Sequence, residues 1–231
     1  MRKSKMALAA LMLMTMAAFT VGCTPEKGDV SGTINGHDYV DLGLPSGTKW
    51  ATCNVGADRP QDYGDYFAWG ETQKKSVYNY DNYQFCRSEK GRVLTKYYGG
   101  DQLTELLVED DAARANWGNE WCIPTYEQWE ELVNNCTVTW TKKNGTQGRL
   151  VTGPSGKSIF LPAAKARWQD DYTEYALWIG DYGSYWSNRV YDNYYWDSWT
   201  LFLDDDGFKL EREDRATGRS VRPVVRPGFA K

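Results

Sequence analysis

Histidine is almost absent from this chain of 231 residues, because only His37 occurs. Zinc centres with histidine ligands and serine–histidine triads both depend on this side chain. A single histidine therefore argues against either kind of site. The cysteines do not compensate, since their spacing is too scattered for a zinc site.

Basic residues are scarce once the N-terminal segment is set aside. Without Arg2, Lys3 and Lys5, 24 of the 27 lysines and arginines remain against 31 acidic residues, a net charge of −7. Binding to nucleic-acid phosphates needs clustered lysine and arginine. We therefore expect no nucleic-acid partner.

Only one long apolar run occurs, and it lies near the N-terminus. Met6 to Val21 is 16 residues without a charge, shorter than the roughly 20 residues that span a bilayer as a helix. The basic residues before it and the small residues up to Cys23 are typical of a secretory signal. The alternatives are a short membrane anchor, a buried helix, and cleavage without lipidation.

The end of this segment, Thr20-Val21-Gly22-Cys23, resembles a bacterial lipobox. The resemblance implies a lipid on Cys23, and so an outer membrane lipoprotein that is exposed at the surface or faces the periplasm. We expect a signal peptide over residues 1–22, a lipidated polar tether over 23–36 and one domain over 37–231.

Four cysteines remain in the mature chain: Cys53, Cys86, Cys122 and Cys136. An even number in an exported protein favours disulfides, and three full pairings are possible. A helix predicted over residues 126–134 would be about 13 Å long, whereas a disulfide needs Cα atoms within about 7 Å. Cys122 and Cys136 flank this helix and are not expected to pair, and free thiols are the alternative.

The predicted helix has a clear start. Thr125 is an expected N-cap, and Gln128 three residues later completes a capping box. Trp129, Leu132 and Val133 share one face by their spacing and predict packing on a core. A second, partly helical stretch is expected over residues 103–115.

Short strands separated by turns make up most of the remaining pattern. We expect strands over residues 39–44, 49–55, 137–141, 149–152, 158–162, 200–203 and 208–211. Few helices among many short strands predict an α+β or mostly-β class, with small twisted antiparallel sheets and many loops.

Several motifs, in order, resemble the Fibrobacter succinogenes major paralogous domain family over roughly residues 37–226. They are residues 41–47 (DLGLPSG), 50–57 (WATCNVGA), 62–71 (DYGDYFAWGE), 117–118 (WG), 124–125 (PT), 129–132 (WEEL), 160–164 (FLPAA), 185–187 (YWS) and 220–224 (SVRPV).

This resemblance implies a C-type-lectin-like fold, akin to that of formylglycine-generating enzymes, in a lipoprotein of Bacteroidota. Those oxidases use a cysteine pair late in the domain, and this chain has no cysteine after Cys136. The related iron enzymes need several histidines. The resemblance therefore favours the fold without the catalysis, and we expect a protein that is not an enzyme and has no cofactor.

The expected ligand-binding surface lies in the aromatic C-terminal third. Residues 168–199 contain five tryptophans and seven tyrosines, the side chains that dominate binding hot spots. Residues 191–197 mix tyrosine, asparagine and aspartate without periodicity, which indicates an exposed loop. The candidates are Tyr182, Tyr185, Arg189, Tyr191, Asp192, Asn193, Tyr194, Tyr195, Trp196, Asp197, Lys209, Glu211, Glu213 and Asp214.

The expected function is binding of an external protein or glycan. In some relatives of this fold the C-terminal third is diversified by retroelements. The variable positions would then be Arg189, Tyr191, Asp192, Asn193, Tyr194, Tyr195, Asp197, Lys209, Glu211, Glu213 and Asp214. Asp204, Asp205 and Asp206 could hold calcium, although a solvated hairpin turn is the simpler interpretation. A glycan-processing enzyme that uses paired carboxylates and a structural subunit of a surface assembly are the alternatives.

Overall fold

The computed structural model describes residues 29–87, 92–168 and 181–229 and shows a mixed α+β protein. About 37% of the described residues are in strands and 10% in helices, and the sheets are curled and mainly antiparallel. This confirms the predicted class. Cys23 and residues 169–180, which are part of the aromatic-rich stretch, lie outside the described residues.

The first sheet has five short strands, which come from both ends and from the middle of the described chain. Its order is β1 (Gly32–Ile34), β2 (His37–Asp41), β3 (Lys49–Ala51), β15 (Val224–Val225) and β7 (Trp121–Cys122). The strands expected over residues 39–44 and 49–55 are present in shorter form as β2 and β3, which pair antiparallel. β1 lies inside the segment expected to be a tether and pairs with β2, Thr33 opposite Asp38. The globular fold therefore begins before the expected boundary at residue 37.

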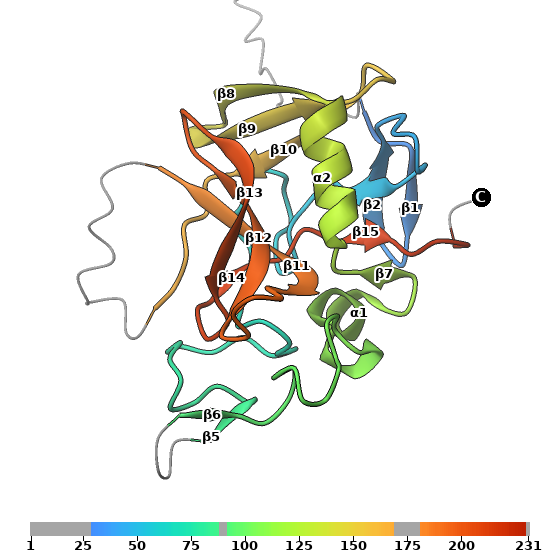
Figure 1. Cartoon of the computed structure of the whole chain (residues 1–231). Helices are drawn as coiled ribbons and strands as arrows, with labels where there is room; N and C mark the ends of the chain where they lie inside the picture. The colour runs from blue at the N-terminus through green and yellow to red at the C-terminus, as the bar shows by residue number, and fades with distance from the viewer. Residues whose placement is uncertain (1–28, 88–91, 169–180, 230–231) are drawn as a thin grey trace, which may run out of the picture.

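Two further sheets are built mostly from hairpins, as the turn signals indicate. One has the order β10 (Ser158–Pro162), β9 (Thr146–Thr152) and β8 (Thr137–Lys143). The other has the order β13 (Phe208–Asp214), β12 (Asp197–Leu203), β11 (Gly183–Val190), β14 (Arg219–Ser220) and β4 (Tyr66–Phe67), and we call it the central sheet. A small hairpin of β5 (Cys86–Arg87) and β6 (Val93–Leu94) lies beyond the end of the central sheet (Figure 1).

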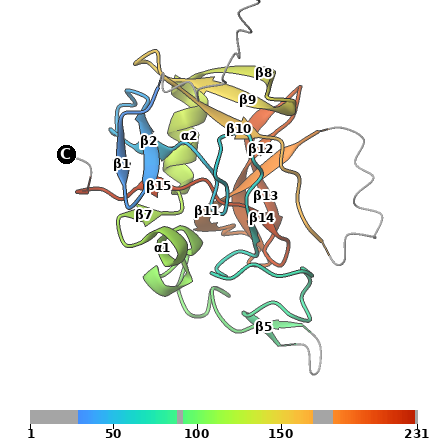
Figure 2. The same cartoon turned by 180° about the vertical axis from the view of Figure 1, so that it is seen from behind.

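The helices are few and short, as expected. A 3-10 turn, η1 (Val108–Asp110), precedes α1 (Ala112–Trp117), and together they form the partly helical stretch. α2 (Tyr126–Asn135) has the predicted capping box, in which Thr125 accepts from the Gln128 N–H and the Gln128 side chain accepts from the Thr125 N–H. α2 contacts three strands of the central sheet, and both views show it beside that sheet (Figures 1 and 2).

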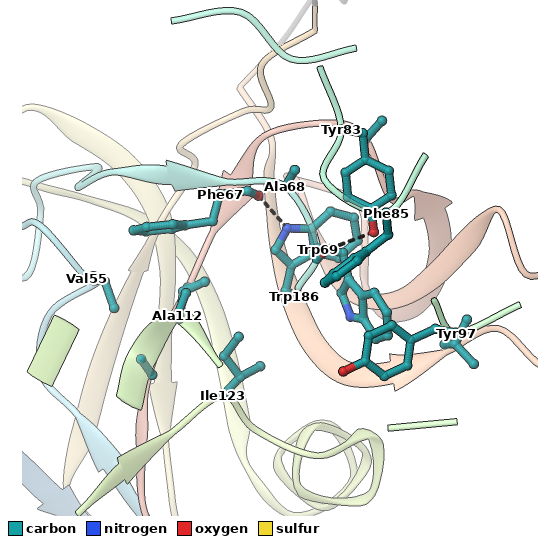
Figure 3. Close-up of a cluster of buried hydrophobic side chains, with 14 of the residues drawn as sticks. Val55, Phe67, Ala68, Trp69, Tyr83, Phe85, Tyr97, Ala112, Ile123 and Trp186 are labelled. Atoms are coloured by element: carbon teal, nitrogen blue, oxygen red, sulfur yellow. Dashed lines mark hydrogen bonds between the residues drawn. The ribbon is translucent and has the colours of Figure 1, made fainter. Parts of the chain in front are cut away.

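The central sheet separates two hydrophobic clusters, because neighbouring residues of a strand point to opposite faces. Tyr185 and Leu201 belong to the cluster beneath α2, together with Trp129 and Leu132, while Val133 is half-buried beside them. Trp186 belongs to the other cluster, which is rich in aromatic rings from the long loops (Figure 3). The two clusters pack on opposite faces of the central sheet. They therefore hold its strands, which carry part of the candidate site, against the long loops.

Two arginines are buried among the apolar side chains of this interior. Arg215 and Arg222 have no exposed surface, and neither is paired with a carboxylate among the described residues. Arg222 donates to Asn54 and to the carbonyl oxygens of Ala51, Thr52 and Phe160. A buried guanidinium is tolerated only when its donors are satisfied, and these carbonyls do so.

Candidate functional site

A groove of about 440 Å³ opens between the β5–β6 hairpin and the loop that joins β11 to β12. It is lined by Arg92, Val93, Leu94 and Tyr98 on one wall and by Asn193, Tyr194, Tyr195 and Trp196 on the other. Val93, Tyr98 and Tyr194 keep 59%, 46% and 50% of their surface exposed. Of the six large hydrophobic side chains exposed in the described part of the chain, three thus border one groove.

The loop that forms the second wall is closed by its own backbone. The Tyr191 N–H donates to the Asp197 carbonyl at 3.0 Å, and the Tyr194 N–H donates to the Tyr191 carbonyl at 3.0 Å. Asp192, Asn193 and Tyr194 are exposed at the tip, while Tyr195 and Trp196 are half-buried against the aromatic cluster. The predicted exposed loop is therefore exposed only at its tip.

Arg215 is buried in the core and donates hydrogen bonds to the backbone of both segments that form the walls of the groove. Its guanidinium donates to the Tyr97 carbonyl at 2.9 Å on one side and to the Tyr195 carbonyl at 2.8 Å on the other. It also donates to the Tyr83 hydroxyl at 3.0 Å and lies 4.6 Å from the centre of the Trp69 ring. Because one rigid side chain bonds both backbones, the width of the groove is set by the core.

Close contacts also fix the aromatic walls. An added Cβ at Gly99 would lie 2.4 Å from the Tyr195 ring, so this glycine lets the ring pack directly on the backbone. The Tyr80 hydroxyl donates to the Trp196 carbonyl at 3.2 Å, and the two rings are 5.0 Å apart at an angle of 80°. The groove is preformed by these contacts.

A row of three aromatic side chains with an arginine at each end continues from the groove toward α2, and we call it the aromatic–arginine ladder. The Trp199 ring lies 4.9 Å from Tyr126 and 5.0 Å from Tyr191. Arg212 lies 5.3 Å from the Tyr191 ring and 5.9 Å from Tyr194, and Arg189 lies 5.8 Å from Tyr126. The ladder residues are Tyr126, Arg189, Tyr191, Trp199 and Arg212.

The two ladder arginines already have acidic partners. Arg189 pairs with Glu127 at 2.8 Å and with Asp192 at 3.3 Å. Arg212 pairs with Asp197 at 3.0 Å. These ion pairs are partly exposed and of small energetic value, but they hold the guanidinium groups against the rings. Four predicted residues therefore lie in or beside the ladder and do not line the groove: Arg189, Tyr191, Asp192 and Asp197.

The other predicted residues do not join this surface. Lys209, Glu211 and Glu213 alternate with Arg212 along β13 and so face the opposite side of the central sheet. Glu213 pairs with Arg219 at 2.7 Å, and Lys209 pairs with Glu211 at 2.7 Å. The fourteen predicted positions therefore do not form one continuous binding surface.

Tyr185 is a correction, and Tyr182 lies apart from the groove. Tyr185 is fully buried in the cluster beneath α2, and its hydroxyl donates to the Pro162 carbonyl at 2.5 Å, so no external ligand reaches it. The sequence around Tyr185 did not indicate which face of β11 is buried, because aromatic residues occur on both faces of this strand. Tyr182 is half-buried and stacks on Phe202 at 5.8 Å.

Two carboxyl groups beneath the loop have perturbed acidity. Asp197 and Asp214 are directly opposite each other on β12 and β13. Burial raises the pKa of Asp214 to about 6, with a smaller contribution from the charge of Asp197. Burial also raises the pKa of Asp197, which Arg212 partly offsets. Asp214 accepts from the Ala216 N–H at 2.8 Å, so its role in the structure is to close the turn after β13.

The acidic turn at residues 204–206 serves its own hairpin. Asp204 accepts from the backbone N–H of Asp206 at 3.0 Å and also from that of Gly207. Within the described ranges, no group of three or more histidine, cysteine or acidic side chains is placed to hold a metal ion. Calcium at Asp204, Asp205 and Asp206 has no support from this geometry.

All four cysteines of the described domain carry free thiols, so the expected disulfides are not formed. Cys53, Cys86, Cys122 and Cys136 are each partly buried and belong to different elements. Burial raises the pKa of Cys122 to about 12 and that of Cys136 to about 11. Because the thiolate is the reactive form, these two cysteines are poor nucleophiles at neutral pH.

The wall formed by Arg92, Val93, Leu94 and Tyr98 was missed by sequence reasoning. These residues lie about a hundred positions before their partners, and no local pattern connects the two segments. The one available signal was the Tyr97-Tyr98-Gly99-Gly100 sequence, in which aromatic residues precede glycines that permit close backbone approach.

None of the helices in the described ranges is long and apolar enough to cross a membrane. Comparison with known proteins found no matching family model, no similar curated protein and no similar solved structure.

Proposed function

We propose that this protein is a membrane-anchored lipoprotein that binds an external ligand through the groove between β6 and the β11–β12 loop. The observation that carries the proposal is the gathering of Val93, Tyr98 and Tyr194, all about half exposed, around one preformed hollow. Contiguous exposed apolar surface is uncommon on a soluble domain unless it contacts a partner. Tyrosine and tryptophan supply such contacts at low entropic cost.

The same proposal includes the family and the anchor. The ordered motifs and the mixed α+β architecture support a C-type-lectin-like fold of the Fibrobacter succinogenes major paralogous domain family. The lipobox-like residues up to Cys23 support an outer membrane lipoprotein, with the domain at the cell surface. Burial raises the pKa values of Cys122 and Cys136, which disfavours thiol chemistry at these two positions.

The test compares single alanine variants on an array of plant and animal glycans that also carries purified mucin. Tyr98→Ala and Tyr194→Ala should each weaken the bound signal at least about tenfold, because hot-spot aromatics contribute more than 1 kcal/mol. Tyr63→Ala is the matched control, since Tyr63 is 41% exposed and does not line the groove. All three variants should keep their unfolding temperature, because the removed rings are exposed.

Other outcomes would contradict the proposal. Shortening of a polysaccharide that is lost on mutating a single aspartate or glutamate would indicate a glycan-processing enzyme. Stable oligomers that form without ligand and dissociate in Tyr194→Ala would indicate a structural subunit of an assembly. Equal binding by the Tyr63, Tyr98 and Tyr194 variants would remove the groove from the function.

A further inference from the structure

Arg92 gives the groove a specific chemical character. It is the only charged side chain among the eight residues that line the hollow. Within the described residues it forms no ion pair, in contrast to Arg189 and Arg212 of the ladder. A cation that has no ion-pair partner among the described residues, at the edge of an aromatic groove, attracts a ligand that carries a negative group.

The position of the Arg92 guanidinium is set by a rigid platform. It lies 4.9 Å from the centre of the Tyr80 ring, and Tyr80 is 4% exposed. The Tyr80 hydroxyl is bonded to the Trp196 carbonyl, which ties the platform to the opposite wall. A guanidinium that lies over a ring presents N–H groups at its edge, and these match the two oxygens of a carboxylate.

The rest of the lining suits a sugar ring. Tyr98 and Tyr194 offer half-exposed aromatic rings, whose electron-rich faces attract the weakly positive C–H groups of a pyranose. Asn193, exposed at the loop tip, has both a donor and an acceptor for hydroxyl groups. The volume of about 440 Å³ falls in the range of small-molecule sites.

We propose that the groove binds a saccharide that carries a carboxylate, with a uronic acid unit as the simplest case. The carboxylate pairs with the edge of the Arg92 guanidinium, the ring packs between Tyr98 and Tyr194, and Asn193 bonds a hydroxyl. This inference rests on the proposed binding function and names its ligand class. A protein partner is disfavoured because a stable protein interface involves roughly 20–30 residues on each side, whereas eight residues line this groove.

The test is calorimetric titration of the purified protein with three acidic oligosaccharides: a trigalacturonate, a hyaluronan tetrasaccharide and a sialyllactose. Each is paired with its own carboxyl methyl ester, which keeps the sugar ring and removes the charge. At least one acid should bind at least about tenfold more tightly than its ester, the size expected for a charge-assisted bidentate pair.

Variants assign the effect to Arg92. Arg92→Gln should weaken binding of the acid roughly tenfold and leave the ester unchanged, and Arg92→Lys should fall between because it loses the planar fork. Arg87→Gln is the matched control, since Arg87 is exposed on the paired strand β5 but does not line the groove. It should bind like the unaltered protein, and all variants should unfold at the same temperature.

The inference is overturned if no acidic oligosaccharide binds, if acid and ester bind equally, or if Arg87→Gln weakens binding as much as Arg92→Gln. Binding of a neutral glycan or of mucin that depends on Tyr98 and Tyr194 but not on Arg92 overturns the acidic ligand and leaves the proposed function standing. Absence of any binding that depends on Tyr98 or Tyr194 overturns both.

Discussion

At the scale of single residues, the buried arginines are the most informative feature of this protein. Arg215 has no exposed surface and bonds three backbone carbonyls and the Tyr83 hydroxyl. Its partners come from both walls of the groove, so the same side chain stabilises the core and sets the shape of the site. A side chain of this kind is expected to be intolerant of substitution.

Replacement of Arg215 by methionine should lower the free energy of unfolding by about 3–5 kcal/mol, because several buried acceptors lose their donor. For a domain of this size that corresponds to a fall of roughly 10 °C in unfolding temperature. Circular dichroism on heating measures the change. Arg59→Met is the control, since Arg59 is exposed and pairs only with Asp62; its melting curve should match that of the unaltered protein. A stable Arg215→Met variant would show that the guanidinium is not needed.

At the scale of elements, the β11–β12 loop shows how a glycine in a distant turn shapes a binding wall. Gly99 has a φ of +86° and packs against the Tyr195 ring. Gly145, in the turn between β8 and β9, has a φ of +88° and nothing near its missing Cβ. Both glycines have a positive φ, which residues with side chains rarely adopt, but only Gly99 has a ring close to the position of its missing Cβ.

Alanine at either glycine should cost about 1 kcal/mol of stability from the left-handed backbone conformation. Gly99→Ala should cost roughly 1–3 kcal/mol more, because its methyl group must displace the Tyr195 ring, and it should also weaken ligand binding. Chemical denaturation of both variants gives the difference. Equal losses for Gly99→Ala and Gly145→Ala would mean that Tyr195 yields without cost and does not define the wall.

At the scale of the whole molecule, the fold is a mixed α+β domain in which the N-terminal strands β1–β3 and the C-terminal strand β15 share a sheet. This pairing brings both ends of the described chain to one side, away from the β5–β6 hairpin (Figures 1 and 2). That hairpin forms one wall of the groove. A protein anchored through its N-terminus would therefore present the groove outward from the membrane.

The proposed anchor predicts that Cys23→Ser abolishes membrane association. Without the thiol there is no site for the lipid, and no helix of the described residues replaces it. Fractionation of cells that express the unaltered and Cys23→Ser proteins, followed by immunoblotting, provides the measurement. Cys53→Ser is the matched control, because Cys53 lies within the folded domain. Retention of Cys23→Ser in the membrane fraction would contradict lipid anchoring at this residue.

The sequence by itself determined the local elements of this protein. The capping box at Thr125 and Gln128, the apolar face of α2 and the hairpin with its turn at residues 204–207 all depend on neighbours within a few positions, and all are present. The exposure of the tip of the aromatic loop could also be predicted from the sequence. Asp192, Asn193 and Tyr194 lie in a run without the periodicity that would bury one face.

Only the tertiary structure decided which aromatic residues face a ligand. Tyr185 and Tyr194 look alike in sequence, but one lies beneath α2 and the other beside Tyr98. Arg92 gained its role from a ring twelve positions earlier and a wall a hundred positions later, and Arg215 from carbonyls on two distant loops. Such contacts join segments that are far apart in the sequence, and they form only when the two clusters pack on the central sheet. No local pattern in the sequence therefore predicts them.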